Sequence, residues 1–135
     1  MRAVLDANVV ASAVCWSGEA YRCLVKLARR QFFAYGSAAT MREAEDVASH
    51  LVWEERPKHN ACGRLNWYLE KVKMVEPAPL GKQRSRDAKD DSYLAVAIAA
   101  GANFIVSYDK DLLEMKKPFG IEIVRPAQFL KLIKG

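Results

Sequence analysis

Residues 3–10, AVLDANVV, open the chain with a short apolar run that meets an acid at Asp6. A short apolar run bounded in this way is typical of a buried strand, and we predict one here. Similar runs follow at residues 31–35, 73–76, 104–107 and 121–124. Between them, apolar residues recur at helical spacing over residues 18–30, 37–52, 61–71, 90–100, 110–115 and 127–133. Strands that alternate with helices predict an α/β fold in which a parallel sheet carries helices on both faces.

The composition describes one globular domain. The chain has 135 residues, of which 51% are hydrophobic and 27% charged, which excludes intrinsic disorder and predicts a single domain over residues 1–135. We expect no membrane span, which needs roughly 20 apolar residues in a row, and no signal peptide ahead of Asp6. The three cysteines form no CxxC pair, which disfavours disulfides or zinc and indicates a cytoplasmic location. The net charge of +5 permits a polyanionic partner and also aids solubility.

Two acids follow two of the predicted strands. Asp6 comes directly after the first strand, and Asp109 comes just after the strand at residues 104–107. Ligands of an open parallel sheet bind outside the carboxyl ends of its strands. We therefore expect Asp6 and Asp109 to lie on one rim of the sheet, although they are far apart in the sequence. Taken alone, each acid could also simply cap a following helix.

Further acids surround the helix that is predicted to begin at residue 90 or 91. Asp91 would share a stripe of this helix with the apolar residues at 94, 95 and 98, so we expect its carboxylate to point along the buried edge toward the rim. We expect Asp90 to cap the free backbone donors at the helix start and Asp87 to be solvated. Glu43 stands on the flank of the buried face of the helix over residues 37–52.

A cluster of carboxylates on one rim indicates a metal site. Like charges a few ångströms apart raise each other's pKa, and a divalent cation removes that repulsion. Mg²⁺ and Mn²⁺ prefer carboxylate and water oxygens as ligands, whereas the two histidines, His50 and His59, lie away from these acids in the sequence. The acids therefore favour metal-assisted hydrolysis, in which the cation lowers the pKa of a bound water and offsets charge on a phosphate.

Four segments resemble the motifs of PIN domain nucleases. Residues 4–13, VLDANVVASA, resemble the hydrophobic-Asp-x-Asn opening of that family. Ser37 followed by Glu43 resembles its Ser-x5-Glu motif. Residues 86–94, RDAKDDSYL, resemble its third acidic motif, and residues 99–113, AAGANFIVSYDKDLL, resemble its ending. The segments follow the family's order and spacing over nearly the whole chain, and the likeness is greatest to VapC-type toxins of toxin–antitoxin systems.

The resemblance implies a three-layer α/β/α fold and an endoribonuclease dependent on Mg²⁺ or Mn²⁺, the toxin of a type II toxin–antitoxin system. It implies catalytic, metal-binding acids at Asp6, Glu43, Asp91 and Asp109, an accessory metal ligand at Asp111, and polar orienting residues at Asn8, Ser107 and Asp90. The motif spacing favours Asp91 over Asp90 as the third acid and leaves both possible. Where the family often has Thr-Gly-Asp, this chain has Ser107-Tyr108-Asp109, which puts a bulky ring beside an acid.

Basic residues around these motifs are candidates for contacts with the RNA backbone. They are Arg56, Lys58, Arg64, Arg84, Arg86 and Lys110. Trp16, Trp53 and Trp67 could stack on bases, although tryptophans more often pack in a core or at a dimer face. The resemblance implies three partners: an RNA substrate, a cognate antitoxin protein and a second copy of the chain.

Two other functions compete with the nuclease. A PIN-like module that binds RNA without cleaving it would keep the same fold, but the presence of every acid argues against it. A phosphotransfer receiver domain also gathers acids around Mg²⁺ at strand ends. A receiver needs an Asp at the end of a middle strand, and the strand at residues 73–76 is instead followed by Pro77.

Overall fold

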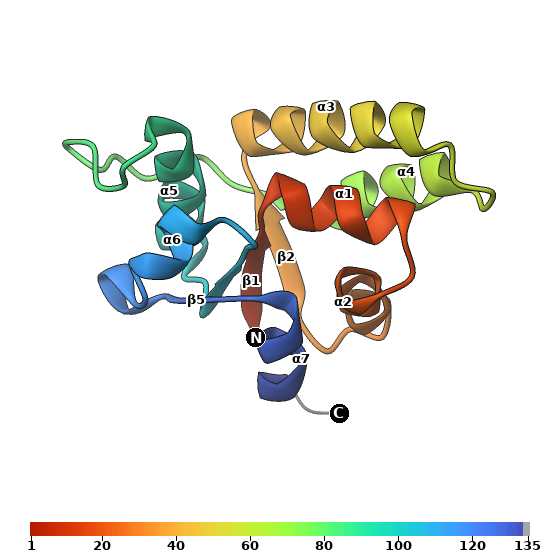
Figure 1. Cartoon of the computed structure of the whole chain (residues 1–135). Coiled ribbons are helices and arrows are strands. Elements are labelled where there is room, and N and C mark those ends of the chain that lie inside the picture. The colour runs from red at the N-terminus through yellow and green to blue at the C-terminus, as the bar shows by residue number, and fades with distance from the viewer. Residues whose placement is uncertain (134–135) are drawn as a thin grey trace.

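A computed structural model describes residues 1–133 and contains a five-stranded parallel sheet between layers of helices (Figure 1). The strands are β1 (Arg2–Leu5), β2 (Phe33–Gly36), β3 (Lys73–Met74), β4 (Phe104–Val106) and β5 (Glu122–Val124). They lie in the order β3-β2-β1-β4-β5, and each neighbouring pair is parallel. The predicted α/β fold with a central parallel sheet is confirmed.

Helices cover both faces of this sheet. They are α1 (Ala7–Cys15), α2 (Glu19–Ala28), α3 (Ala38–Glu55), α4 (Ala61–Lys71), α5 (Asp91–Ala100), α6 (Lys110–Glu114) and α7 (Pro126–Leu132), with short 3₁₀ turns at η1 (Ala88–Asp90) and η2 (Pro118–Gly120). One core lies between the sheet and α1, α2, α3, α4 and α7, and a second lies between the sheet and α5 and α6. Successive side chains of β1 alternate between them, with Ala3 and Leu5 in the first core and Val4 in the second.

Helix α1 is absent from the helices predicted from the sequence, which began at residue 18. The strand ends at Leu5, and a helix begins at Ala7. Val9, Val10 and Val14 are fully buried, because α1 packs against α2, α3 and α4. A helix that is buried on nearly all sides has no polar stripe, so its sequence lacks the periodicity by which an amphipathic helix is recognised.

The order of the strands fixes where a ligand would bind. The chain moves outward from β1 to β2 and β3, and then crosses to the other side of β1 to form β4 and β5. The winding direction therefore reverses between β1 and β4, and open parallel sheets bind ligands at the carboxyl ends of the strands at such a point. Asp6 follows β1, and Asp109 lies shortly after β4.

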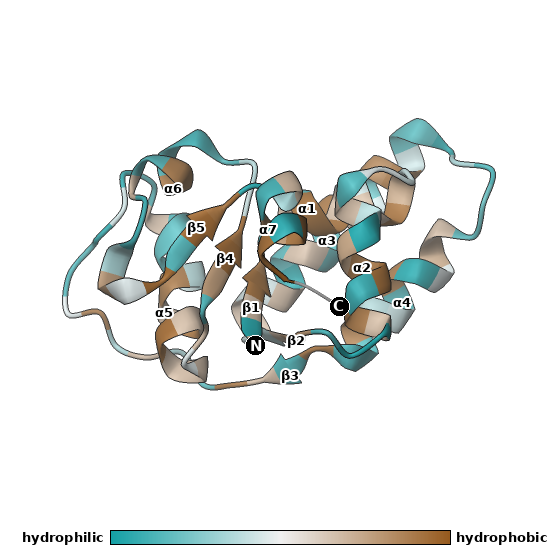
Figure 2. Ribbon diagram, turned by 90° about the horizontal axis from the view of Figure 1, so that it is seen from below, coloured by the Kyte–Doolittle hydropathy of each residue, from teal (hydrophilic) through white to brown (hydrophobic). Residues whose placement is uncertain are grey.

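Apolar packing holds the fold together. Figure 2 shows the strands β1, β4 and β5 as largely hydrophobic segments between the helices.

Cys15 and Cys23 are buried free thiols, and Cys62 is an exposed one. Within residues 1–133, no helix combines the length and the apolarity needed to cross a membrane.

Candidate active site

A serine hydroxyl links the two acids at the switch point, which is the carboxyl edge of the sheet where the winding direction reverses between β1 and β4. The backbone N–H of Asp6 donates to the carbonyl of Val106 at 2.9 Å, which extends the β1–β4 ladder to the rim. The Ser107 hydroxyl donates to Oδ2 of Asp6 at 2.7 Å and accepts from the backbone N–H of Asp109 at 2.8 Å. Ser107 is completely buried, so this link is shielded from water. The structure thus brings Asp6 and Asp109 to one rim.

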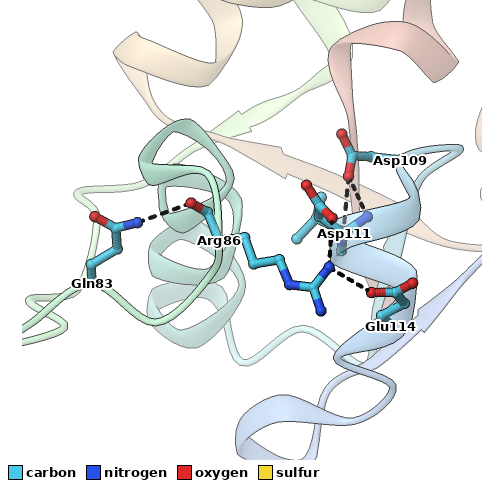
Figure 3. A network of polar contacts seen from close by, with 6 residues as sticks. Gln83, Arg86, Asp109, Asp111 and Glu114 are labelled. Carbon is cyan, nitrogen blue, oxygen red and sulfur yellow. Dashed lines mark hydrogen bonds and ion pairs between the residues drawn. The ribbon is translucent and has the colours of Figure 1, made fainter.

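Asp109 also caps helix α6. Its Oδ1 accepts hydrogen bonds from the backbone N–H groups of Asp111 at 2.8 Å and Leu112 at 3.2 Å (Figure 3). The capping role considered for this acid is therefore present, and it occurs together with a position on the rim. Because the cap fixes the carboxylate on the first turn of α6, Asp109 is held rigidly beside the sheet edge.

The acids line a pocket of about 270 Å³ at the carboxyl edge of the sheet. Its charged and amide-bearing lining residues are Asp6, Asn8, Glu43, Asp87, Lys89, Asp90 and Asp109. Asp111 lies next to them, since carboxylate oxygens of Asp90, Asp109 and Asp111 all lie within 4.8 Å of one another. Of the acids expected to share the site, the structure places all but Asp91 in or beside this pocket.

Neither Asp90 nor Asp91 occupies the position expected for it. Asp90 makes no side-chain capping bond at the start of α5; its carboxylate is buried in the acidic pocket. Asp91 instead accepts three hydrogen bonds from the preceding loop, from the backbone N–H of Arg84 at 2.9 Å, the backbone N–H of Ser85 at 2.8 Å and the Ser85 hydroxyl at 2.5 Å. The reason is that η1 leads directly into α5, so Asp90 already lies in a helical turn and Asp87 makes the capping bond of η1.

The electrostatics of the pocket suit a cation. Burial and, after it, the neighbouring carboxylates of Asp109, Asp87, Asp6 and Asp111 together raise the pKa of Asp90 to about 7. Among the described residues, Oδ2 of Asp90 is buried without a hydrogen-bond partner. Burial also raises the pKa of Asp6, although the hydrogen bond from Ser107 opposes that rise. A buried, unpartnered carboxylate oxygen among further carboxylates is a donor set that fits a hard divalent cation.

Asp91 has the opposite electrostatic environment. Desolvation acts to raise its pKa, but hydrogen bonds from Ser85 and Arg84 outweigh it and hold the pKa below the ordinary value. These bonds satisfy the carboxylate within its own loop. Asp91 therefore shapes the segment before α5 and does not face the other acids.

Glu43 reaches the pocket from α3 and is held there by a tyrosine. The hydroxyl of Tyr93 donates to Oε1 of Glu43 and accepts from the backbone N–H of Ala7 at 3.3 Å. Tyr93 was not among the site residues predicted from the sequence, and neither was Lys89, which lines the pocket. Asp90 and Tyr93 are three residues apart in the continuous helical segment that η1 and α5 form, and this spacing is the signal that places both side chains on the same face.

The candidate RNA-binding residues fall into two groups. One group is close to the acids in the chain: Arg84 and Arg86 precede η1, and Lys110 begins α6 directly after Asp109. Arg56 and Lys58 lie in the connection after α3, at the end of that helix away from the rim, after roughly 27 Å of helix (Figure 1). Arg64 donates to backbone carbonyls at the C-terminal end of α1, also away from the rim. The structure thus does not bring Arg56, Lys58 or Arg64 to the acids.

Arg86 connects the loop before η1 to helix α6. Its guanidinium lies 3.5 Å from Oδ1 of Asp111 and 3.2 Å from Oε2 of Glu114 (Figure 3). The side chain of Arg86 is 76% exposed, so these ion pairs are screened by solvent and contribute little to stability. Their effect is to keep a positive charge beside the acidic pocket, where an anionic ligand would meet it.

Comparisons with known proteins found a matching family model and similar solved structures. The family model described as PIN domain matches residues 2–111. Among solved structures, the chain is similar to VapBC2 from Rickettsia felis bound to a DNA fragment from their promoter, with a TM-score of 0.61 and 16% identity over 91% of this chain and 97% of that chain. It is also similar to PAE2754 from Pyrobaculum aerophilum, with a TM-score of 0.60 and 21% identity over 98% of this chain and 89% of that chain. No curated protein matches the sequence.

The matched residues extend from β1 to α6 and include every acid at the rim. At these identities the two solved structures establish the common fold, and the family model adds the agreement in sequence. The chain belongs to the PIN domain family.

Proposed function

We propose that this protein is an endoribonuclease that depends on Mg²⁺ or Mn²⁺ and is the toxin of a type II toxin–antitoxin system. The observation that carries the proposal is the buried, unpartnered Oδ2 of Asp90, surrounded by the carboxylates of Asp6, Asp109 and Asp111 at the switch point of the sheet. A carboxylate without a partner is costly to bury, so a site of this kind is explained by a cation that neutralises it.

Asp6, Asp90 and Asp109 would hold the cation, with Glu43 and Asp111 at its edges. Asp90 takes the place that the motif spacing had favoured for Asp91. When bound, a divalent cation would lower the pKa of a water molecule and offset the charge that builds up on the scissile phosphate. Ser107 contributes by donating to Asp6, which favours the ionised form of that carboxylate.

Positive side chains beside the acids support a nucleic-acid substrate. Lys89 lines the pocket, and the exposed Arg86 pairs with Asp111, which lies beside it. Both would attract the phosphates on either side of the scissile bond, and the excess of basic residues in the chain adds a long-range attraction. The choice of RNA over DNA rests on the resemblance to VapC-type toxins.

A groove between α2 and α4 supports an antitoxin partner. Two adjacent cavities, of about 250 and 420 Å³, share Ala28 and Trp67. Their apolar floor is bordered by the cationic side chains of Arg29, Arg30, Arg64, Lys71 and Lys73. An acidic amphipathic segment of an antitoxin would complement both features. Trp67→Ala should weaken antitoxin binding in calorimetry by about tenfold and leave cleavage by the free protein unchanged.

We also propose a homodimer. Large apolar side chains are exposed on several elements, among them Trp53 at 68% and Met74 at 57%. Apolar side chains on a small protein's surface are suited to an interface. A monomeric mass in light scattering at micromolar concentration would contradict the dimer.

The central experiment compares RNA cleavage by the wild type and by Asp6→Asn, each with Mn²⁺ and with EDTA. We expect cleavage only by the wild type with Mn²⁺, together with a higher melting temperature in Mn²⁺ than in EDTA, because a ligand of the folded state stabilises it. Cleavage that survives exhaustive EDTA treatment would contradict the metal mechanism. RNA binding without cleavage would support the alternative, a PIN-like module that has lost activity.

A further inference from the structure

Tyr93 lies beneath the acidic pocket and connects two of its walls. The residue is 2% exposed and belongs to α5, the helix that begins directly after Asp90 of the pocket. Its hydroxyl accepts from the backbone N–H of Ala7 at 3.3 Å and donates to Oε1 of Glu43. Ala7 directly follows Asp6, so one hydroxyl joins the start of α1 to an acid carried by α3.

We propose that Tyr93 is a positioning residue of the metal site, which holds the Glu43 carboxylate toward Asp6 and thereby sets the affinity of the pocket for a divalent cation. The inference rests on the proposed function, because it assumes that Glu43 takes part in binding the cation. It adds a residue that supplies no ligand atom and acts through another side chain.

The direction of the two hydrogen bonds supports this role. A phenol has one proton, and the backbone N–H of Ala7 can only donate. The hydroxyl must therefore accept from Ala7, and its own proton points to Glu43, which is the orientation that a carboxylate acceptor requires. The N–H of Ala7 is one of the free donors at the start of α1, so this bond also keeps the hydroxyl from turning away.

The ring of Tyr93 is itself fixed. It packs in the second core with the fully buried side chains of Val4, Leu94 and Ile105, which come from β1, α5 and β4. Glu43, in contrast, is half-buried and has a long side chain on the flank of α3. A rigid donor that holds a flexible ligand in place reduces the ordering that the cation must impose.

The test measures Mn²⁺ binding by calorimetry and RNA cleavage across a Mn²⁺ titration, for the wild type, Tyr93→Phe, Glu43→Gln and the double variant. Tyr93→Phe removes only the hydroxyl oxygen. We expect it to weaken Mn²⁺ binding by about 10- to 100-fold, as the loss of a residue that orients a ligand does, and cleavage to recover at high Mn²⁺. In the Glu43→Gln background, Tyr93→Phe should change binding by less than about twofold, because two residues that act as one unit are not additive.

Tyr68→Phe is the matched control. Tyr68 is also buried, but it lies in the first core on α4, and we expect its variant to bind Mn²⁺ as the wild type does. Glu43→Asp is a second variant that leaves Tyr93 intact and withdraws the carboxylate by one methylene group. It should weaken Mn²⁺ binding to a similar extent, which keeps the test valid if Tyr93→Phe folds poorly.

Three outcomes would overturn the proposal. Tyr93→Phe could bind Mn²⁺ as tightly as the wild type, Glu43→Asp could do so, or the losses in the double variant could multiply as for independent sites. A wild type that neither binds Mn²⁺ nor cleaves RNA would show that the proposed function itself is wrong. A wild type that does both, with an unaffected Tyr93→Phe, would overturn the role of Tyr93 alone.

Discussion

The carboxylates of Asp90 and Asp91 belong to adjacent residues but lie in different parts of the structure. Asp90 is in the acidic pocket, and Asp91 accepts hydrogen bonds from Arg84 and Ser85. Both residues have helical backbone angles, so their side chains diverge by about 100° around the helix axis. One acid is therefore available to a cation, and the other holds the loop that precedes it.

This divergence predicts opposite effects of two matched substitutions. Asp90→Asn should reduce Mn²⁺-dependent RNA cleavage by more than about tenfold and leave stability unchanged or raised, because it removes a buried charge. Asp91→Asn should lower the free energy of unfolding by about 1 kcal/mol, because it disturbs the hydrogen bonds from Ser85 and Arg84, and it should keep most of the activity. Denaturant midpoints and cleavage rates check both expectations. An inactive Asp91→Asn beside an active Asp90→Asn would identify Asp91 as the ligand.

The raised pKa of Asp90 predicts how the stability of the metal-free protein depends on pH. The pKa is about 7 in the folded protein against an ordinary value of 3.8. Between these values the folded state binds more protons than the unfolded state, so the free energy of unfolding should fall as pH rises from about 4 to about 7.

Asp90→Asn should remove this contribution. In EDTA, the free energy of unfolding of Asp90→Asn should exceed that of the wild type by more at pH 8 than at pH 5. The excess should grow by at least about 1 kcal/mol, which corresponds to roughly one pKa unit. Urea titrations at the two pH values measure the difference. Added Mn²⁺ should restore the stability of the wild type at pH 8. If the stabilities of the two proteins depended on pH in the same way, a buried, protonated Asp90 would be contradicted.

Most of the fold could be predicted because most elements carry a local signal. Strands β4 and β5 are short apolar runs, and α5 ends at Gly101 in the left-handed conformation, where the sequence placed a helix end. Helix α1 was missed because it is buried by tertiary contacts with α2, α3 and α4, and the run Val9-Val10 then resembles a strand. Burial on all sides comes from the fold and leaves no periodic pattern in the sequence.

The site was predictable where it depends on topology and less so where it depends on a rotation about a helix. Strand ends place Asp6 and Asp109 on one rim whatever the details of the loops. The choice between Asp90 and Asp91 depends on whether η1 continues into α5, and a shift of one residue turns a side chain by about 100°. Tyr93 was missed because its role arises from contacts with Ala7 and Glu43, which come from two other helices.

Ser107→Ala tests the link between the two acids at the switch point. The substitution removes the donor to Asp6 and the acceptor for the backbone N–H of Asp109, both in a completely buried position. We expect the free energy of unfolding to fall by about 1–3 kcal/mol and cleavage at limiting Mn²⁺ to fall by about tenfold. Ser49→Ala, on the exposed face of α3, is the control and should behave as the wild type. Unchanged cleavage and Mn²⁺ binding in Ser107→Ala would show that the link does not support the site.

Arg86→Ala separates a contact with substrate from a contact within the protein. The ion pairs of Arg86 with Asp111 and Glu114 are exposed, so their loss should change the free energy of unfolding by less than about 1 kcal/mol. If Arg86 instead meets a phosphate of the RNA, KM should rise several-fold at constant kcat, and the salt dependence of binding should weaken by about one charge.

Arg56→Ala is the matched control for this prediction, because it removes the same charge from the far end of α3. A general electrostatic attraction would raise the KM for RNA equally in the two variants, since both lower the net charge of the protein by one. A phosphate contact at the pocket affects the Arg86 variant and not the Arg56 variant, because the guanidinium of Arg86 lies beside Asp111. Equal KM values for the two variants, measured at two salt concentrations, would therefore show that Arg86 acts only through the net charge of the protein. Lys89 would then be the basic residue that contacts a phosphate in the pocket, which it lines.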